Sequence, residues 1–491
     1  MKFKLGLIAL AMSASVALAQ ENYSTWGSMR FLTINGSVGG GTVTKFPLLV
    51  RLTSAQADVF ANSKGKGADI RFTKSNLTTR YPHQIERWDS AGQKAEIWVL
   101  VDSIAANTNT SIKMLWNKAG AADSSKGSAV FTTANGFVSV LHLGDSTGTN
   151  PRPNQVVGAP TGLLTNFGMP TTEDPTPATY VAPEGVIGRA DALRGGAGDN
   201  LAGSHDFIDL NRRSYEGFSD FSAGFTFSTW LYSTGPVFAE RFVEILDDTT
   251  SSASSDTRII LFGNRQNPAV NAFSVRWGAS GTYNSAVDNL YAPNAWYHLV
   301  FTKPAGTAPM TIYANGVETD VTADLPDLAV GLRNYVYMGR SSVTASDPYF
   351  QGMFDEVSFA KAARSAAWAK LSYETQKAGA NAIVVGTTAA PAAGGSDYTG
   401  ILGAGSHGTH SFATRVAGRQ VFFNLPAATA GKVSVLDVFG RTVWSSNVTA
   451  TASAIAWDGM GRNGNASRGV YVARFESLKG ATLERKFAYN P

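Results

Sequence analysis

Short runs of alternating apolar and polar residues recur along the chain, and they constrain its fold more than any other feature. FPLLVRL (46–52), AEIWVLV (95–101), FTFSTWLY (225–232) and WYHLVFTK (296–303) are examples, with Gly, Asn or Ser residues between such runs. Successive side chains of a strand point to opposite faces, so this period of two predicts half-buried β-strands. With 491 residues and about 150 residues per domain, the prediction is an all-β chain of about three domains.

The N-terminus has the features of a secretory signal peptide. Lys2 and Lys4 precede an apolar run that ends in the small-residue triplet Ala-Leu-Ala at 17–19. We therefore predict a signal peptide at residues 1–19, cleavage before Gln20, and a secreted or outer cell-surface location. No stretch reaches the roughly 20 apolar residues of a membrane helix, so no transmembrane segment is expected in the mature chain.

Composition excludes several kinds of chemistry. The chain has no cysteine, which rules out disulfides, thiolate metal sites, a cysteine nucleophile and a lipid anchor on cysteine. The formal charge is +4 and falls to +2 without the two leader lysines. Since Lys and Arg form no evident cluster, nucleic acid is not an expected partner.

The first folded unit is predicted at residues 23–133, as a small antiparallel β-sandwich. Its phrases GADIRFTKSN, IERWDSAGQKAEIWVLVDSI and SIKMLWNKAG resemble a bacterial domain-of-unknown-function family that often lies beside lectin-like domains. That resemblance implies no activity.

The second unit is predicted at residues 137–379. Its phrases FTFSTW, WYHLVFT, IYANG and GMFDEVSFAKAARS, in this order, are similar to the LamG or concanavalin A-like jelly roll. Asn315-Gly316 between alternating residues predicts a hairpin, because a type I′ turn needs positive φ at both central positions. The stretch AAWAKLSYETQK predicts a short helix that Ser365 caps.

An Ala/Gly/Pro-rich linker is predicted at residues 380–410, and a third unit at 411–491. The phrases KVSVLDVFGRTVW, SAIAWDGMGRNGN and RGVYVARFE resemble the FlgD-like, immunoglobulin-type sorting domain of proteins exported by type IX-like secretion. The resemblance implies a secretion machinery as partner. The terminal YNP departs from the basic end of many such domains, so the export route stays open.

QGMFDEVSF (351–359) places two adjacent carboxylates inside a predicted strand. Strict alternation puts Asp355 on the apolar, core-facing side with Val357 and Phe359, and Glu356 on the other side. The two carboxylates therefore cannot face each other across a scissile bond as a glycosidase pair does. A buried Asp355 needs backbone donors, a cation or a metal ion to offset its charge.

Two interpretations of Asp355 stay open. The LamG resemblance implies that this aspartate ligates calcium, and the candidate further ligands are Asp145, Asp206 and Asp209. The alternative is a carboxylate satisfied by backbone N–H groups.

No catalytic residue is predicted. Glu244 and Asp248 only superficially resemble the acidic strand of jelly-roll glucanases, and a solvated strand end is favoured for them. His407 and His410 lie in the Gly-rich linker, which supplies neither rigidity nor further metal ligands.

Aromatic residues near strand ends and loops of the second unit are the predicted ligand-binding residues: Trp277, Tyr283, Tyr291, Tyr335 and Tyr349. Each one alone is expected to be structural, whereas a cluster would favour binding. Trp230 and Trp296 are interpreted as packing residues.

The favoured function is noncatalytic recognition of a polysaccharide or surface glycan, a hypothesis that rests on fold analogy. The alternatives are a glycan-cleaving enzyme, which needs two carboxylates facing each other in a groove, and a purely structural or adhesive surface protein.

Overall fold

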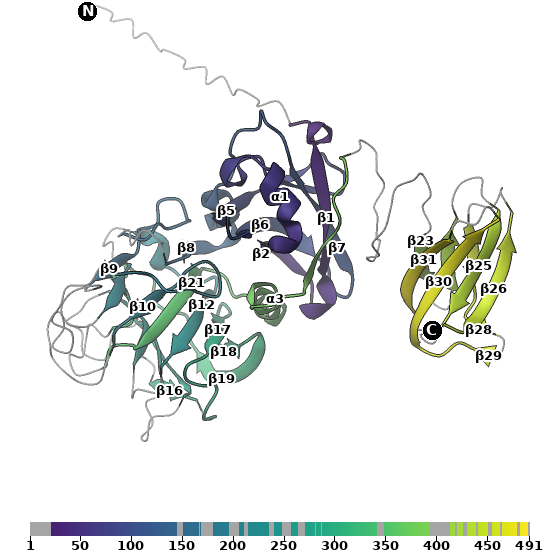
Figure 1. Cartoon of the computed structure of the whole chain (residues 1–491). Helices are drawn as coiled ribbons and strands as arrows, with labels where there is room; N and C mark the ends of the chain where they lie inside the picture. Colours follow the sequence, from purple (N-terminus) through teal and green to yellow (C-terminus); the bar gives the residue numbers. More distant parts are fainter. Residues whose placement is uncertain are drawn as a thin grey trace, which may run out of the picture. The chain divides into compact units, whose positions relative to one another are not determined.

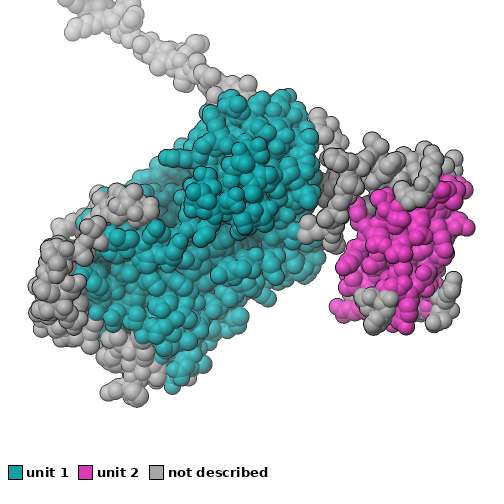
Figure 2. Space-filling model, viewed as in Figure 1, with its two compact units in different colours: residues 1–394 teal, residues 395–491 magenta. Residues whose placement is uncertain are grey.

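The computed structural model describes two ranges of the chain, 21–391 and 413–489. Gaps inside these ranges lie at 145–150, 166, 168–179, 196–205, 211–214, 235–239, 248–256, 264–270, 280, 286, 341–347, 418–419, 426–429, 438–439, 450–453, 462–463 and 479–481. The predicted signal peptide lies outside the described residues. The chain divides into two compact units, residues 1–394 and 395–491 (Figure 2).

The N-terminal sandwich packs a sheet of order β22-β1-β7-β3-β4 against a sheet of order β2-β6-β5 (Figure 1). Their bounds are β1 Ser28–Asn35, β2 Val43–Leu52, β3 Arg71–Lys74, β4 Arg80–Tyr81, β5 His83–Asp89, β6 Lys94–Ile104, β7 Asn109–Trp116 and β22 Ile383–Val385, with short helices α1 Ala57–Asn62 and α2 Gly127–Val130. The apolar members of the alternating runs form its core, so the prediction of a small antiparallel sandwich is confirmed.

Strand β22 corrects the predicted linker. It lies within residues 380–410, yet it pairs with β1, with Ile383 opposite Ile34 and Val385 opposite Leu32. The three residues of β22 are all β-branched and apolar, which favours a strand. A strand of only three residues inside an Ala/Gly-rich segment gives no clear alternating pattern in the sequence. Most of the remaining predicted linker lies outside the described residues.

The jelly roll consists of two seven-stranded antiparallel sheets. One sheet packs towards the N-terminal sandwich and is called the seam sheet below; it contains β8 Phe137–Leu141, β10 Asp191–Leu193, β12 Phe225–Ser233, β17 Trp296–Lys303, β18 Ala308–Ala314, β19 Val317–Leu325 and β21 Gly352–Ala360. The other, called the distal sheet below, contains β9 Leu163–Thr165, β11 Phe207–Asp209, β13 Arg241–Leu246, β14 Ile259–Gly263, β15 Phe273–Trp277, β16 Thr282–Asn284 and β20 Tyr335–Met338. Alternate residues of both sheets form one apolar core, and the all-β fold class is confirmed.

Two local predictions are also confirmed. Asn315 and Gly316 adopt φ of 52° and 74° at the turn between β18 and β19. The Ser365 hydroxyl accepts a hydrogen bond from the Trp368 backbone N–H at the start of α3, Ala366–Gln376.

Helix α3 joins the sandwich to the jelly roll, in a contact called the seam below (Figure 1). Trp368 and Leu371 of α3 belong to the same buried cluster as Phe46 of β2 and Val300 of β17. Because this apolar core is continuous, the sandwich and the jelly roll form one compact unit.

The C-terminal unit is a second small sandwich, with sheets of order β23-β24-β27 and β26-β25-β30-β31 and a short β28-β29 ribbon. The bounds are β23 Ala413–Ala417, β24 Gln420–Asn424, β25 Gly431–Leu436, β26 Thr442–Val448, β27 Ala454–Trp457, β28 Met460–Gly461, β29 Gly464–Asn465, β30 Gly469–Ser477 and β31 Thr482–Tyr489. Trp457, Phe475 and Phe487 lie in its core. Among the described residues, no helix is long and apolar enough to cross a membrane.

Candidate functional site

A β-bulge in β21 changes the direction of the two adjacent carboxylates. Phe354, Val357 and Phe359 all belong to the jelly-roll core, which strict alternation does not allow. The register with β12 shifts near Glu356, and Glu356 has a φ of 52°, as the extra residue of a bulge can. Asp355 therefore does not share the core face with Val357 and Phe359, so that prediction is wrong, and both carboxylates interact with residues outside the core.

Asp355 is held by backbone donors. Its Oδ2 accepts hydrogen bonds from the N–H groups of Val186 and Ile187, at 2.8 and 2.9 Å. Its Oδ1 is buried and has no hydrogen-bond partner among the described residues. Burial, together with the neighbouring Glu356 carboxylate, raises the pKa of Asp355 well above its usual range. This arrangement matches the alternative in which backbone N–H groups satisfy the carboxylate.

The candidate further calcium ligands do not gather around Asp355. Asp206 pairs with Arg194 at 2.8 Å, Asp209 lies on the distal sheet opposite Tyr337, and Asp145 lies outside the described residues. Calcium takes six to eight oxygen ligands, and the described residues do not supply such a set at this position. Calcium at Asp355 stays a prediction.

A cluster of one histidine and two glutamates lies in the seam beside Asp355. Glu86 comes from β5, His142 follows β8, and Glu356 is the bulge residue of β21; one ligand atom from each lies within 4.8 Å of the other two. His142 Nδ1 is 2.8 Å from Glu356 Oε2 and 3.4 Å from Glu86 Oε2. The side chains are 7–10% exposed, too buried for a sugar to reach them.

Aromatic rings and amides fix the orientation of His142. The Trp98 ring stacks on the imidazole at 5.8 Å, and Phe131 packs edge-on at 5.5 Å. Trp98 Nε1 also donates to Glu86 Oε2 at 2.7 Å. His142 Nε2 lies 3.1 Å from Gln84 Oε1.

Burial dominates the electrostatics of the cluster. Burial and the Glu356 charge raise the pKa of Glu86 to about 8, and burial raises the pKa of Glu356 well above its usual range. Burial lowers the pKa of His142. Sequence reasoning missed Glu86 and His142. Neither residue lies in a local sequence motif, because the two meet only where the sandwich packs on the jelly roll.

The distal sheet carries a cluster of aromatic rings on the side away from the core, called the ring cluster below. Its members are Phe207 and Tyr337, which are buried at 7% and 8% exposed, and Tyr335, Tyr349 and Arg340, which are partly exposed. Val336 and Met338 point into the core, so Tyr335 and Tyr337 point outward. Tyr337 lies 6.1 Å from Tyr335 and 5.7 Å from Phe207, which is 6.4 Å from Tyr349.

The Arg340 guanidinium lies over three of these rings, 4.5 Å from Phe207, 5.0 Å from Tyr337 and 5.9 Å from Tyr349. The structure thus brings together two of the five predicted ligand-binding residues, Tyr335 and Tyr349, both partly exposed. Sequence reasoning missed Tyr337 and Phe207, although the Tyr-x-Tyr spacing in YVYM places both tyrosines on one face of a strand.

The other predicted aromatic residues lie elsewhere. Trp277 and Tyr291 are 1% and 2% exposed and belong to the jelly-roll core, so they offer no ring face to a sugar, and their prediction as ligand-binding residues is corrected. Tyr283 is partly buried, and its hydroxyl donates to Asp320 at 2.7 Å. Trp230 is buried in packing contacts as predicted, whereas Trp296 is partly exposed.

The prediction of a solvated strand end at Glu244 is wrong. Glu244 is fully buried opposite Tyr337 in the sheet, and its Oε1 lies 3.9 Å from Arg241 Nε. The run is a central strand of the distal sheet, which sequence alternation alone does not distinguish from a strand end. Asp248 lies outside the described residues, so the structure does not place the second acid of this pair.

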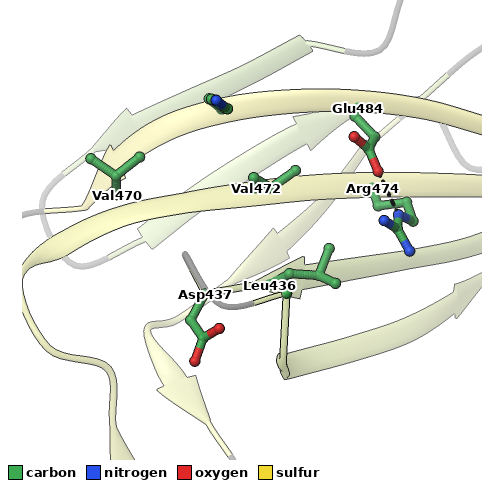
Figure 3. Close-up of a pocket in the computed structure, with 8 residues that line it drawn as sticks. Leu436, Asp437, Val470, Val472, Arg474 and Glu484 are labelled. Atoms are coloured by element: carbon green, nitrogen blue, oxygen red, sulfur yellow. Dashed lines mark hydrogen bonds and ion pairs between the residues drawn. The ribbon is translucent and has the colours of Figure 1, made fainter.

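The C-terminal sandwich has a cavity of about 290 Å³ lined by residues of β25, β30 and β31 (Figure 3). Its apolar lining is Leu436, Val470 and Val472, and the Arg474–Glu484 ion pair, at 2.6 Å, borders it. These residues alternate with the core residues of the same strands, so the cavity lies on the outer face of the sheet.

Comparisons with known proteins agree with this architecture. Residues 203–370 match the Laminin_G_3 family, described as the concanavalin A-like lectin/glucanases superfamily, and residues 66–143 match DUF2341, a domain of unknown function. The chain therefore contains a concanavalin A-like domain and an N-terminal DUF2341 domain. Glu86 and His142 lie in the second match and Glu356 in the first.

Solved structures show weaker likeness. Domain 4 of the GH43 extracellular arabinanase AbnA from Geobacillus stearothermophilus is 20% identical, with 48% of this chain and 97% of that domain covered and a TM-score of 0.32. The Trypanosoma rangeli sialidase is 11% identical (49% and 33% covered, TM-score 0.33), and the binding domain of botulinum neurotoxin DC is 10% identical (72% and 73% covered, TM-score 0.34). No curated protein matches the chain.

Proposed function

We propose that the protein is a noncatalytic glycan-binding protein, acting at or outside the cell surface, that binds polysaccharide at the ring cluster of the distal sheet. The ring cluster is the observation that carries this proposal. Aromatic faces contact the apolar faces of sugar rings, and an adjacent guanidinium donates hydrogen bonds to hydroxyl or carboxylate oxygens. Arg340 lies over Tyr349, and Tyr335 packs beside Tyr337 in the same cluster, so both kinds of contact are available.

Binding rather than cleavage is favoured by the placement of the acids. Two acids lie opposite Tyr337 in the sheet: Glu244 is fully buried and near Arg241, whereas Asp209 is partly exposed. An acid pair for glycoside hydrolysis must reach both sides of a scissile bond. The purified protein is therefore expected to release no reducing sugar from a polysaccharide that it binds.

The proposal is tested by glycan-array binding of the full mature chain, followed by affinity measurement on the best ligand. Tyr349→Ala and Tyr335→Ala are each expected to weaken binding by about tenfold, the loss of roughly one ring contact. Tyr232→Ala is the matched control, because Tyr232 is also partly exposed and has an edge-on aromatic neighbour, Trp296, but lies on the seam sheet. Equal losses in all three variants would argue against the ring cluster as the binding site.

We further propose that residues 411–491 act as the sorting domain that delivers the chain to a secretion machinery. Deleting them should stop export while the remaining unit still folds. Normal surface display of the truncated chain would contradict this. Cleavage of the signal peptide before Gln20 is checked by mass spectrometry of exported protein.

A further inference from the structure

Three potential metal ligands converge in the seam from distant stretches of the chain. Glu86 belongs to the sandwich, whereas His142 and Glu356 belong to the jelly roll. His142 Nδ1 lies 2.8 and 3.0 Å from the two Glu356 oxygens and 3.4 Å from Glu86 Oε2. Ligand atoms of a tetrahedral zinc site, with bonds of about 2.0 Å, lie about 3.3 Å apart. The spacing therefore suits such an ion after small side-chain shifts.

The hydrogen bonds of His142 indicate which ring nitrogen directs a lone pair towards the two carboxylates. Gln84 donates its amide N–H to Gln155 Oε1 at 3.0 Å, which turns Gln84 Oε1 towards His142 Nε2 at 3.1 Å. A carbonyl oxygen only accepts, so Nε2 carries the hydrogen, and Nδ1 of the neutral ring is an acceptor. Histidine metal ligands are held in this way, by a hydrogen bond on the nitrogen that does not bind the metal.

The positive charge of Arg51 acts on Glu356, but Arg51 does not form an ion pair with the cluster. Across the described part of the chain, no Lys or Arg forms an ion pair with Glu86 or Glu356. The Arg51 guanidinium donates to backbone carbonyls, including those of Gln376 and Lys377, and Arg87 pairs with Glu96. The buried Oδ1 of Asp355, next to Glu356, also has no described hydrogen-bond partner. Three facing acceptors in a buried place repel one another unless a shared proton or a cation lies between them.

We propose that Glu86, His142 and Glu356 bind one divalent transition-metal ion of the zinc class, which links the N-terminal sandwich to the jelly roll. Zinc accepts imidazole nitrogen and carboxylate oxygen together, whereas calcium prefers a shell of six to eight oxygens. The ion adds a cross-link to the apolar contacts of the seam. This proposal is independent of glycan binding at the distal sheet.

The test measures retained metal in the full chain. Protein is unfolded in guanidinium with a chelator, refolded with zinc, dialysed, and analysed by mass spectrometry for metal. Wild type is expected to retain about one zinc per chain, and Glu86→Gln and Glu356→Gln less than about a tenth of that. Glu184→Gln is the matched control, because Glu184 is an exposed glutamate that pairs with Arg87 and is not part of the cluster. The Glu184→Gln variant should retain zinc like wild type.

Melting temperatures separate loss of a ligand from loss of the fold. Glutamine has nearly the same shape as glutamate but cannot carry a negative charge, so it lowers the repulsion among the facing acceptors. Metal-free Glu356→Gln should therefore melt at a higher temperature than metal-free wild type, while zinc should raise the melting temperature of wild type only. The proposal would be overturned if refolded wild type held no zinc, or if wild type and both glutamine variants held equal amounts. In that case, protons shared among the three side chains would stabilise the cluster.

Discussion

The two sheets of the jelly roll share one apolar core but differ on the faces that point away from it. The seam sheet presents Glu356 and the buried ring of Trp230 to α3 and the sandwich, whereas the distal sheet presents the partly exposed Tyr335 and Arg340. Residues at core positions determine the fold, and residues at the alternate positions determine what each face contacts. One fold can therefore support domain attachment on one side and ligand contact on the other.

The largest expected effect tests whether the seam contributes to stability as a core does. Trp368 is 7% exposed and packs edge-on against Phe46. Trp368→Ala should lower the free energy of unfolding by about 3–5 kcal/mol, measured by chemical denaturation. Lys370→Ala, an exposed position on the same helix, should change it by less than about 0.5 kcal/mol. A small loss in Trp368→Ala would mean that the seam is only a loose contact.

A second effect concerns pH on the seam sheet. Burial lowers the pKa of His298 to about 3, against 6.5 in the unfolded chain. Between these values the unfolded state binds the proton and the folded state does not, so stability is full above pH 6.5 and falls as pH drops towards 3. From pH 7 to pH 5 this residue should account for about 2 kcal/mol. Urea unfolding at both pH values should show a smaller drop in His298→Gln than in wild type, and equal drops would contradict the burial argument.

A third effect separates the two interpretations of Asp355. Asp355→Ala leaves the buried N–H groups of Val186 and Ile187 without their acceptor, which should cost about 1–3 kcal/mol. Asp355→Asn keeps an acceptor oxygen and should cost less. If backbone N–H groups alone hold Asp355, calcium added to chelator-treated wild type leaves its melting temperature unchanged. A calcium-dependent rise that Asp355→Asn abolishes would confirm the calcium prediction.

The smallest effect lies at the edge of the distal sheet. The Tyr283 hydroxyl donates to Asp320 and to the Val321 carbonyl, so Tyr283→Phe should lose about 1 kcal/mol of stability. Glycan affinity should stay the same, because Tyr283 is not part of the ring cluster. A weaker affinity in this variant, measured beside Tyr349→Ala, would extend the binding surface to β16.

Local physics made much of the fold predictable. The alternating runs located strands such as β6, β12 and β17, because a half-buried sheet requires that period. Asn315-Gly316 and Ser365 specified a turn and a helix start through their own backbone and side-chain preferences. These features depend on neighbours a few residues away, so the sequence alone determined them.

The site depends on residues that are distant in the chain. The alternating pattern predicts that one face of a strand is buried, but it does not show which element covers that face. The core positions of Trp277 and Tyr291 and the outward position of Tyr335 are therefore seen only in the packed sheets. The bulge at Glu356 shifts the face of every residue before it relative to those after it. Glu86, His142 and Glu356 meet only when the sandwich packs on the jelly roll, and that contact is a property of the tertiary structure.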